Sequence, residues 1–213
     1  LRAESAWFIP AISASSFFLI LLFGRFLPGR GAIISIVAVS LGFILFWPVL
    51  KDVVDTGTSS AKITWFSVGD TTVRLGITVD LMSATMLGLI TFVSLLVQIY
   101  SVGYMKREPR LVWYFALHGL FAATMTTLVL ADNLLFLYFA WELVGLCSYL
   151  LIGFRFERKP AAEAAKKAFI TTRIGDVALL IGIIILFNAT GHFEISTIIH
   201  VVEQGGVNNT LLT

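Results

Sequence analysis

The sequence predicts an all-α polytopic membrane protein with about six transmembrane helices and one external β-hairpin. The first observation is composition: 58% of the 213 residues are hydrophobic, 13% are charged, and the mean hydropathy is +0.92. Soluble domains carry about 25% charged residues. The second observation is that apolar runs of about 20 residues recur, which is the length a helix needs to cross a bilayer. The third is a stretch rich in Thr, Val and Ile, which favours strands.

Six apolar runs are each long enough to form a transmembrane helix. They span residues 6–26, 31–50, 81–105, 111–131, 133–154 and 166–189. The first run is too long for a signal peptide and lacks the small-residue cleavage pattern, so we expect it to be a retained helix. We expect residues 1–213 to form a single transmembrane domain that is part of a longer chain.

Basic residues in the loops are distributed unevenly between the two faces of the predicted bundle. Ten lie after the first, third and fifth spans, and four lie before the first span or after the second. The ten are Arg25, Arg30, Lys106, Arg107, Arg110, Arg155, Arg158, Lys159, Lys166 and Lys167, and the four are Arg2, Lys51, Lys62 and Arg74. Because cytoplasmic loops carry the excess of lysine and arginine, we predict that the first group faces the cytoplasm and that the N-terminus lies outside.

The connection over residues 51–80 predicts the external β-hairpin. Residues 62–68 and 71–79 are rich in Thr, Val, Ile and aromatic side chains. Gly69-Asp70 lies between them, and a two-residue turn that begins with glycine is typical of type II′. A hairpin is therefore expected on the face opposite to the ten basic residues.

Residues 190–213 predict a second external loop. Phe193 to Glu203 has the pattern of a short amphipathic helix, and Gly205-Gly206 follows it as an end signal. His192 and His200 in this region have neither helical ligand spacing nor nearby cysteines, so we expect no metal site there.

Several other classes of protein are excluded by what the chain contains. The net charge is only +2, and no exposed basic patch is interleaved with aromatic residues, so no nucleic-acid partner is expected. Cys147 is the single cysteine and lies in an apolar run, which leaves no disulfide framework and no metal quartet. No glycine-rich phosphate loop or dinucleotide fingerprint follows a predicted strand, so we expect this chain to bind no cofactor itself.

One carboxylate, Glu142, stands inside the fifth apolar run. At helical rise it lies about 13 Å from Asn133 and about 18 Å from Phe154, which places it near the middle of the bilayer. An ionisable group there costs about 2.5–3.5 kcal/mol even on lenient insertion scales, and it usually faces the bundle interior with a partner. Tyr138 and Tyr149 share its helix face, and either could hydrogen-bond the carboxyl group.

The sixth run carries two further charges, Arg173 and Asp176, and their spacing of three puts them on one helix face. They either serve function or form a mutually neutralising pair that only orders the bundle. Lys166 and Lys167 precede them and are predicted to lie at the cytoplasmic rim. The charged residues are therefore expected at increasing depth in the membrane, from the two lysines through Asp176 to Glu142. His118 in the fourth span is a further secondary candidate because its charge switches near neutral pH.

Two ordered motifs point to one family. Trp141-Glu142-Leu-Val-Gly-Leu-Cys-Ser-Tyr-Leu-Leu-Ile-Gly-Phe154 is followed by Lys167-Ala-Phe-Ile-Thr-Thr-Arg173-Ile-Gly-Asp176. This pair resembles the largest antiporter-like membrane subunit, of subunit L or chain 5 type, of proton-pumping NADH:quinone oxidoreductase, respiratory complex I. Thr172 departs from the family, which more often has Asn before the arginine. The resemblance covers nearly the whole chain but only part of the family's length.

The resemblance implies an antiporter-like fold of two inverted repeats of five helices, the first of which begins at the fourth span. It also implies that the glutamate pairs with a lysine on the helix after next, beyond Thr213. FMN, iron–sulfur clusters and quinone are implied in partner subunits, and the hairpin is implied to help link neighbouring antiporter-like subunits. The implied location is an energy-coupling membrane, here expected to be the bacterial plasma membrane.

Three functions from different classes follow. In the first, the chain is a non-redox subunit of a translocase, and Glu142, Asp176 and Arg173 transfer protons or tune that transfer while quinone is reduced elsewhere in the complex. In the second, it is a subunit of a multi-subunit, Mrp-type sodium/proton antiporter. In the third, it is a structural membrane subunit whose charges only hold helices together.

Overall fold

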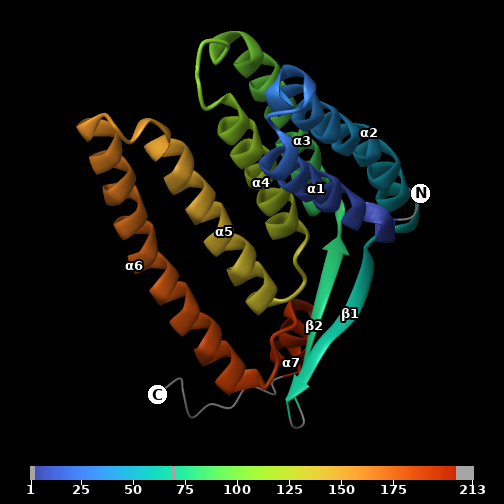
Figure 1. Ribbon diagram of the computed structural model, residues 1–213. Coiled ribbons are helices and arrows are strands. Elements are labelled where there is room, and N and C mark those ends of the chain that lie inside the picture. Colours follow the sequence, from blue (N-terminus) through green and yellow to red (C-terminus); the bar gives the residue numbers. More distant parts are fainter. Residues whose placement is uncertain (1–2, 69–70, 205–213) are drawn as a thin grey trace.

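The computed structural model describes residues 3–68 and 71–204. Within these residues, six helices are long and apolar enough to cross a membrane by length and composition, which confirms the predicted all-α membrane fold with six spans (Figure 1). The helices are α1 (Phe8–Phe23), α2 (Ala32–Thr56), α3 (Leu81–Tyr104), α4 (Leu111–Leu130), α5 (Leu134–Ile152) and α6 (Lys159–Thr190). Short 3-10 turns precede α1 and α2 and follow α5, at Ala3–Trp7, Pro28–Gly31 and Gly153–Arg155.

Two helices extend beyond the apolar runs that predicted them. α2 continues to Thr56 rather than ending at residue 50, although it contains Pro48. α6 begins at Lys159 rather than at residue 166, so the prediction that Lys159, Lys166 and Lys167 lie in a loop is wrong. The reason is that hydropathy measures the part of a helix that can lie in lipid, whereas Ala, Glu and Lys are good helix formers in water. A proline in the first turn of α6 is also favourable there.

Helices α1 to α4 form a compact bundle, and α5 and α6 lie along one side of it (Figure 1). Small residues allow close approach: a Cβ atom at Gly119 of α4 would lie 2.9 Å from the Ser16 Oγ atom of α1. By contrast, the only buried side chains on α5 are Ala140 and Cys147. The two helices that carry the predicted charges are therefore the most exposed of the spans.

The predicted hairpin is confirmed. Strands β1 (Ser59–Val68) and β2 (Thr71–Val79) pair antiparallel, with Ser59 opposite Val79 and a register shift between Thr64 and Phe66. The predicted type II′ turn at Gly69-Asp70 lies outside the described residues. In Figure 1 the hairpin runs along the end of the bundle where α4 ends and α5 begins, which we call the hairpin end.

The connection between α4 and α5 ties the hairpin to the end of the described chain. It forms one β-bridge to strand β2, Ile77 to Ala131, and another to the segment before α7, Asn133 to Glu194. Helix α7 (Ile195–Glu203) follows α6 after the short connection 191–194, and the predicted end signal at Gly205-Gly206 lies outside the described residues. Three segments far apart in the sequence, namely strand β2, the α4–α5 connection and the segment before α7, are thus joined by backbone bridges at the hairpin end.

Helix α3 begins with a capping box that yields a testable prediction. The Asp80 Oδ1 atom accepts a hydrogen bond from the Ser83 N–H group at 2.6 Å, and the Ser83 Oγ atom accepts one from the Asp80 N–H group at 2.8 Å. The Ser83 N–H group lowers the pKa of the Asp80 carboxyl group. A lowered folded-state pKa means that the stabilisation is present above the unfolded-state pKa and is lost as pH falls through the folded-state value.

Asp80→Ala is expected to weaken the start of α3 by about 1 kcal/mol, as the loss of an N-cap usually does. Amide hydrogen exchange in the first turn of α3 should then be about fivefold faster. Asp80→Asn is the matched control, because asparagine caps nearly as well as aspartate. Equal exchange in the Ala and Asn variants would show that the cap contributes little.

Candidate functional site

The three charges predicted in the fifth and sixth spans form one cluster. Arg173 of α6 makes an ion pair through Nη1 with the Glu142 Oε2 atom of α5, and the same nitrogen lies 3.5 Å from the Asp176 Oδ2 atom. The side chains of Arg173, Glu142 and Asp176 are 31, 22 and 5% exposed. The spacing of three on α6 placed Arg173 and Asp176 on one face, as the sequence predicted. The structure adds that this face meets Glu142.

Trp141 completes the cluster from the residue next to Glu142. Its Nε1–H group donates a hydrogen bond to the Asp176 Oδ1 atom at 2.8 Å. This hydrogen bond fixes the carboxylate that is farthest from solvent. Sequence reasoning did not assign Trp141, although an indole N–H group inside an apolar helix needs an acceptor and thus offered a signal.

The guanidinium group of Arg173 is held from several directions. It lies over the ring of Phe169, with the Cζ atom 4.4 Å from the ring centroid, a distance typical of a cation–π contact. Gly145 of α5 faces it, and a Cβ atom at that position would lie 3.7 Å from the Nη2 atom. The buried Nε atom of Arg173 has no hydrogen-bond partner among the described residues. Arg173 therefore keeps one donor that neither carboxylate uses.

The two predicted tyrosines do not bind the carboxyl groups directly. Within residues 3–68 and 71–204, neither Tyr138 nor Tyr149 hydrogen-bonds Glu142 or Asp176. Tyr149 instead packs on Phe169, with 5.0 Å between ring centroids. Phe169 contacts the guanidinium group of Arg173, so Tyr149 supports that group indirectly, through the ring of Phe169.

The cluster holds two carboxylates and one guanidinium group. With both acids ionised it carries one net negative charge, and a buried charge without a counterion is costly. Binding one proton makes the cluster neutral. One proton is therefore enough to balance the charges of this cluster.

Lys166 and Lys167 lie on α6 outside this cluster. They precede Arg173 by seven and six residues, or by about 10 Å at helical rise. Both side chains are exposed. Lys166 lines a pocket of about 680 Å³ together with Arg110, Trp113, Tyr149, Phe154 and Phe156. The two lysines thus lie near the start of α6, and among the described residues neither forms an ion pair with Glu142 or Asp176.

His118 belongs to a different polar contact. It is buried in α4, and its Nδ1 atom lies 3.4 Å from the Gln98 Nε2 atom of α3. The Gln98 Oε1 atom is buried and has no hydrogen-bond partner in the described part of the chain. The structure therefore does not bring His118 to the Glu142 cluster.

Two family models match the chain. Residues 65–115 match NADH-ubiquinone oxidoreductase (complex I), chain 5 N-terminus, and residues 131–213 match the NADH:quinone oxidoreductase/Mrp antiporter transmembrane family. Together they cover more than half of the chain. The chain belongs to the antiporter-like subunits of the complex I family. The second match contains Glu142, Arg173 and Asp176.

Curated relatives agree with this family. The chain is 46% identical over 185 residues to F(420)H(2) dehydrogenase subunit L of Methanosarcina mazei, covering 86% of this chain and 27% of the relative. It is 40% identical over 211 residues to NAD(P)H-quinone oxidoreductase chain 5 of Synechocystis sp., covering 92% of this chain and 30% of the relative. The chain thus spans less than a third of the length of these two relatives.

Solved structures share the fold. The membrane-bound sulfane sulfur reductase, an archaeal respiratory membrane complex, matches with a TM-score of 0.84 and 18% identity, covering 98% of this chain and 42% of that chain. The Mrp complex from Dietzia sp. DQ12-45-1b matches with a TM-score of 0.77 and 22% identity, covering 91% of this chain and 20% of that chain. At these identities the comparisons show the antiporter-like fold alone.

Proposed function

We propose that the chain is a proton-translocating membrane subunit of an NADH:quinone oxidoreductase, in which quinone reduction elsewhere in the complex drives proton transfer through Glu142, Arg173 and Asp176. The observation that carries the proposal is the shared cation. One guanidinium group lies between two carboxylates on neighbouring spans, and it cannot neutralise both. One proton bound to either carboxylate would balance the remaining negative charge.

Arg173 acts as the control element in this proposal. A cation within about 4–6 Å favours the ionised form of a carboxyl group. In this proposal the guanidinium group pairs with either Glu142 or Asp176, and the proton is held by the carboxyl group that the guanidinium group leaves. An electrostatic change that reaches the cluster from a neighbouring subunit therefore moves a proton by shifting one side chain.

The redox chemistry belongs to partner subunits in this proposal. An iron–sulfur cluster is held by several cysteine thiolates, whereas this chain has one cysteine, Cys147, which is buried in α5. The chain therefore does not fit such a cluster. FMN, iron–sulfur clusters and quinone would be bound by other subunits of the complex. This chain itself would contact a neighbouring antiporter-like subunit and the surrounding lipid bilayer.

A multi-subunit, Mrp-type sodium/proton antiporter is the alternative, because the family that matches residues 131–213 includes Mrp antiporters as well as NADH:quinone oxidoreductases. The two functions differ in what drives transport. In inverted vesicles containing the whole complex, the proposed function predicts that addition of an electron donor and quinone acidifies the lumen in sodium-free buffer. Acidification that requires a sodium gradient and ignores quinone would favour the antiporter.

We propose that the ten basic residues that follow the first, third and fifth apolar runs or begin the sixth lie on the cytoplasmic side of a bacterial membrane and that the N-terminus lies outside. Single cysteines at Arg25 and Lys159 should then react only with reagents that reach the cytoplasm, whereas one at exposed Thr58 should react only from outside. The unmodified chain is the control, since Cys147 is buried. Labelling of Arg25 and Thr58 positions from the same side would contradict this orientation.

A further inference from the structure

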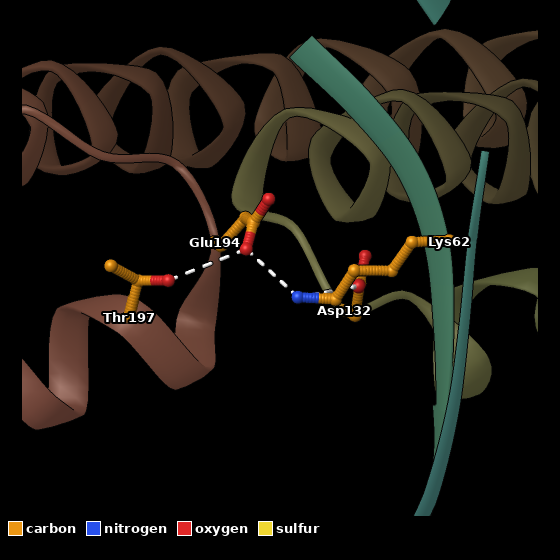
Figure 2. A network of polar contacts seen from close by, with 4 residues as sticks. All are labelled: Lys62, Asp132, Glu194 and Thr197. Carbon is orange, nitrogen blue, oxygen red and sulfur yellow. Dashed lines mark hydrogen bonds and ion pairs between the residues drawn. The ribbon is translucent and has the colours of Figure 1, made fainter. Parts of the chain in front are cut away.

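A second charge cluster lies at the hairpin end, where three segments converge (Figure 2). Lys62 of β1 reaches from the hairpin, Asp132 lies between α4 and α5, and Glu194 lies just before α7. The Lys62 Nζ atom is 2.8 Å from the Glu194 Oε2 atom but 3.9 Å from the Asp132 Oδ2 atom. Thr197 also donates a hydrogen bond to the Glu194 Oε2 atom, at 3.3 Å. The lysine is therefore closer to Glu194 than to Asp132.

Asp132 is held in place by its backbone. Its N–H group donates to the Gly76 carbonyl oxygen at 3.3 Å, and its own carbonyl oxygen accepts from the Ile195 N–H group at 3.0 Å. The carboxyl group lies so close to strand β2 that a Cβ atom at Gly76 would come within 2.2 Å of the Oδ2 atom. A side chain at position 76 would therefore require the Asp132 carboxyl group to move.

The Asp132 carboxyl group is buried without hydrogen bonds. The residue is 5% exposed, and neither Oδ1 nor Oδ2 has a hydrogen-bond partner among the described residues. Burial raises the pKa of Asp132, Lys62 lowers it, and Glu194 raises it again. A buried carboxylate whose nearest cation is already engaged is costly, whereas a protonated carboxyl group is neutral.

A pocket lies on one side of Asp132. A pocket of about 280 Å³ is lined by Asp132 together with polar residues of the β2–α3 junction and α7, namely Thr78, Asp80, Ser83 and Ser196. Asp80 is thus the third acid that faces this region, beside Glu194.

We propose that Asp132 is a proton-binding site at the hairpin end, occupied when Lys62 pairs with Glu194 and emptied when Lys62 pairs with Asp132. The inference rests on the proposed function in one respect, because it makes Asp132 a second station for the translocated proton. Asp132 precedes Glu142 by ten residues, or about 15 Å along the chain direction of α5. The two sites therefore exchange protons through intervening water or polar groups rather than directly.

The test is an infrared pH titration of the whole complex that follows the C=O band of protonated carboxyl groups. Asp132→Asn should remove one titrating band. Lys62→Gln should raise the midpoint pH of that band by about 1, because a cation near 4 Å is lost. Glu194→Gln should lower the midpoint, because it removes a negative charge and frees Lys62 to pair with Asp132.

Two controls make the result specific. Asp55→Asn removes an exposed carboxylate at the end of α2 and should leave the band unchanged. Glu142→Gln should also leave it, so the Asp132 site can stand even if Glu142 proves not to carry protons. If Asp132→Asn fails to assemble, opposite shifts in the Lys62 and Glu194 variants still support the proposal. An unchanged band in Asp132→Asn, or shifts of the same sign in the other two, would overturn it.

Discussion

Arg173→Leu is expected to remove most of the chain from the assembled complex. The change leaves Glu142 and Asp176 facing each other in an apolar region without their shared cation. Removing one partner of a buried ion pair costs about 3–5 kcal/mol, which is a large part of the stability of a typical domain. The measurement is the subunit content of purified complex by immunoblot, relative to the unmodified chain.

Two companion variants separate charge from shape at this position. Arg173→Lys keeps the charge but loses the planar fork that contacts two carboxylates, so an intermediate content is expected. Arg173→Leu combined with Glu142→Gln and Asp176→Asn makes the cluster neutral and should recover assembly, but not proton pumping. Such non-additivity is expected of residues in contact. Normal assembly of Arg173→Leu alone would show that the ion pairs are not structural.

The six spans and the hairpin could be predicted from the sequence because each depends on local composition. A run of about 20 apolar residues has the length and composition to span a bilayer, and this does not depend on its neighbours in the fold. Two Thr- and Val-rich segments on either side of a short turn pair with each other. The ends of the helices were harder to predict from the sequence. α6 continues in water over Lys166 and Lys167, where helix propensity rather than hydropathy decides.

The candidate site was predictable only in part. The spacing of Arg173 and Asp176 gave their common face, but the contact with Glu142 depends on how α5 and α6 pack, which the sequence does not encode locally. The same holds for Trp141, whose acceptor lies on another helix. Asp132 and Lys62 are 70 positions apart, and only the folded hairpin brings them together.

Glu142→Gln is the second change with a large expected effect. Glutamine keeps the shape of the side chain and can accept a hydrogen bond from Arg173, but it does not titrate. Arg173 still has Asp176 at 3.5 Å, so the cluster becomes neutral without a proton. We therefore expect normal assembly, loss of most proton pumping, and slower electron transfer to the extent that the two are coupled.

Glu142→Asp is the matched control for this variant. Aspartate keeps the titrating group on a shorter arm, so it should retain part of both activities. If Glu142 only held α5 and α6 together, the order would reverse, because a neutral amide costs less to bury than an unpaired charge. The Gln variant would then perform at least as well as the Asp variant.

The most direct test of the central claim is the number of protons translocated per electron by vesicles that contain the Glu142→Gln complex. Subunit content is checked on the same samples by immunoblot, and the unmodified complex gives the reference ratio. Proton transfer through the cluster predicts a ratio far below that of the unmodified complex, at normal subunit content. A ratio equal to that of the unmodified complex would remove Glu142 from the mechanism.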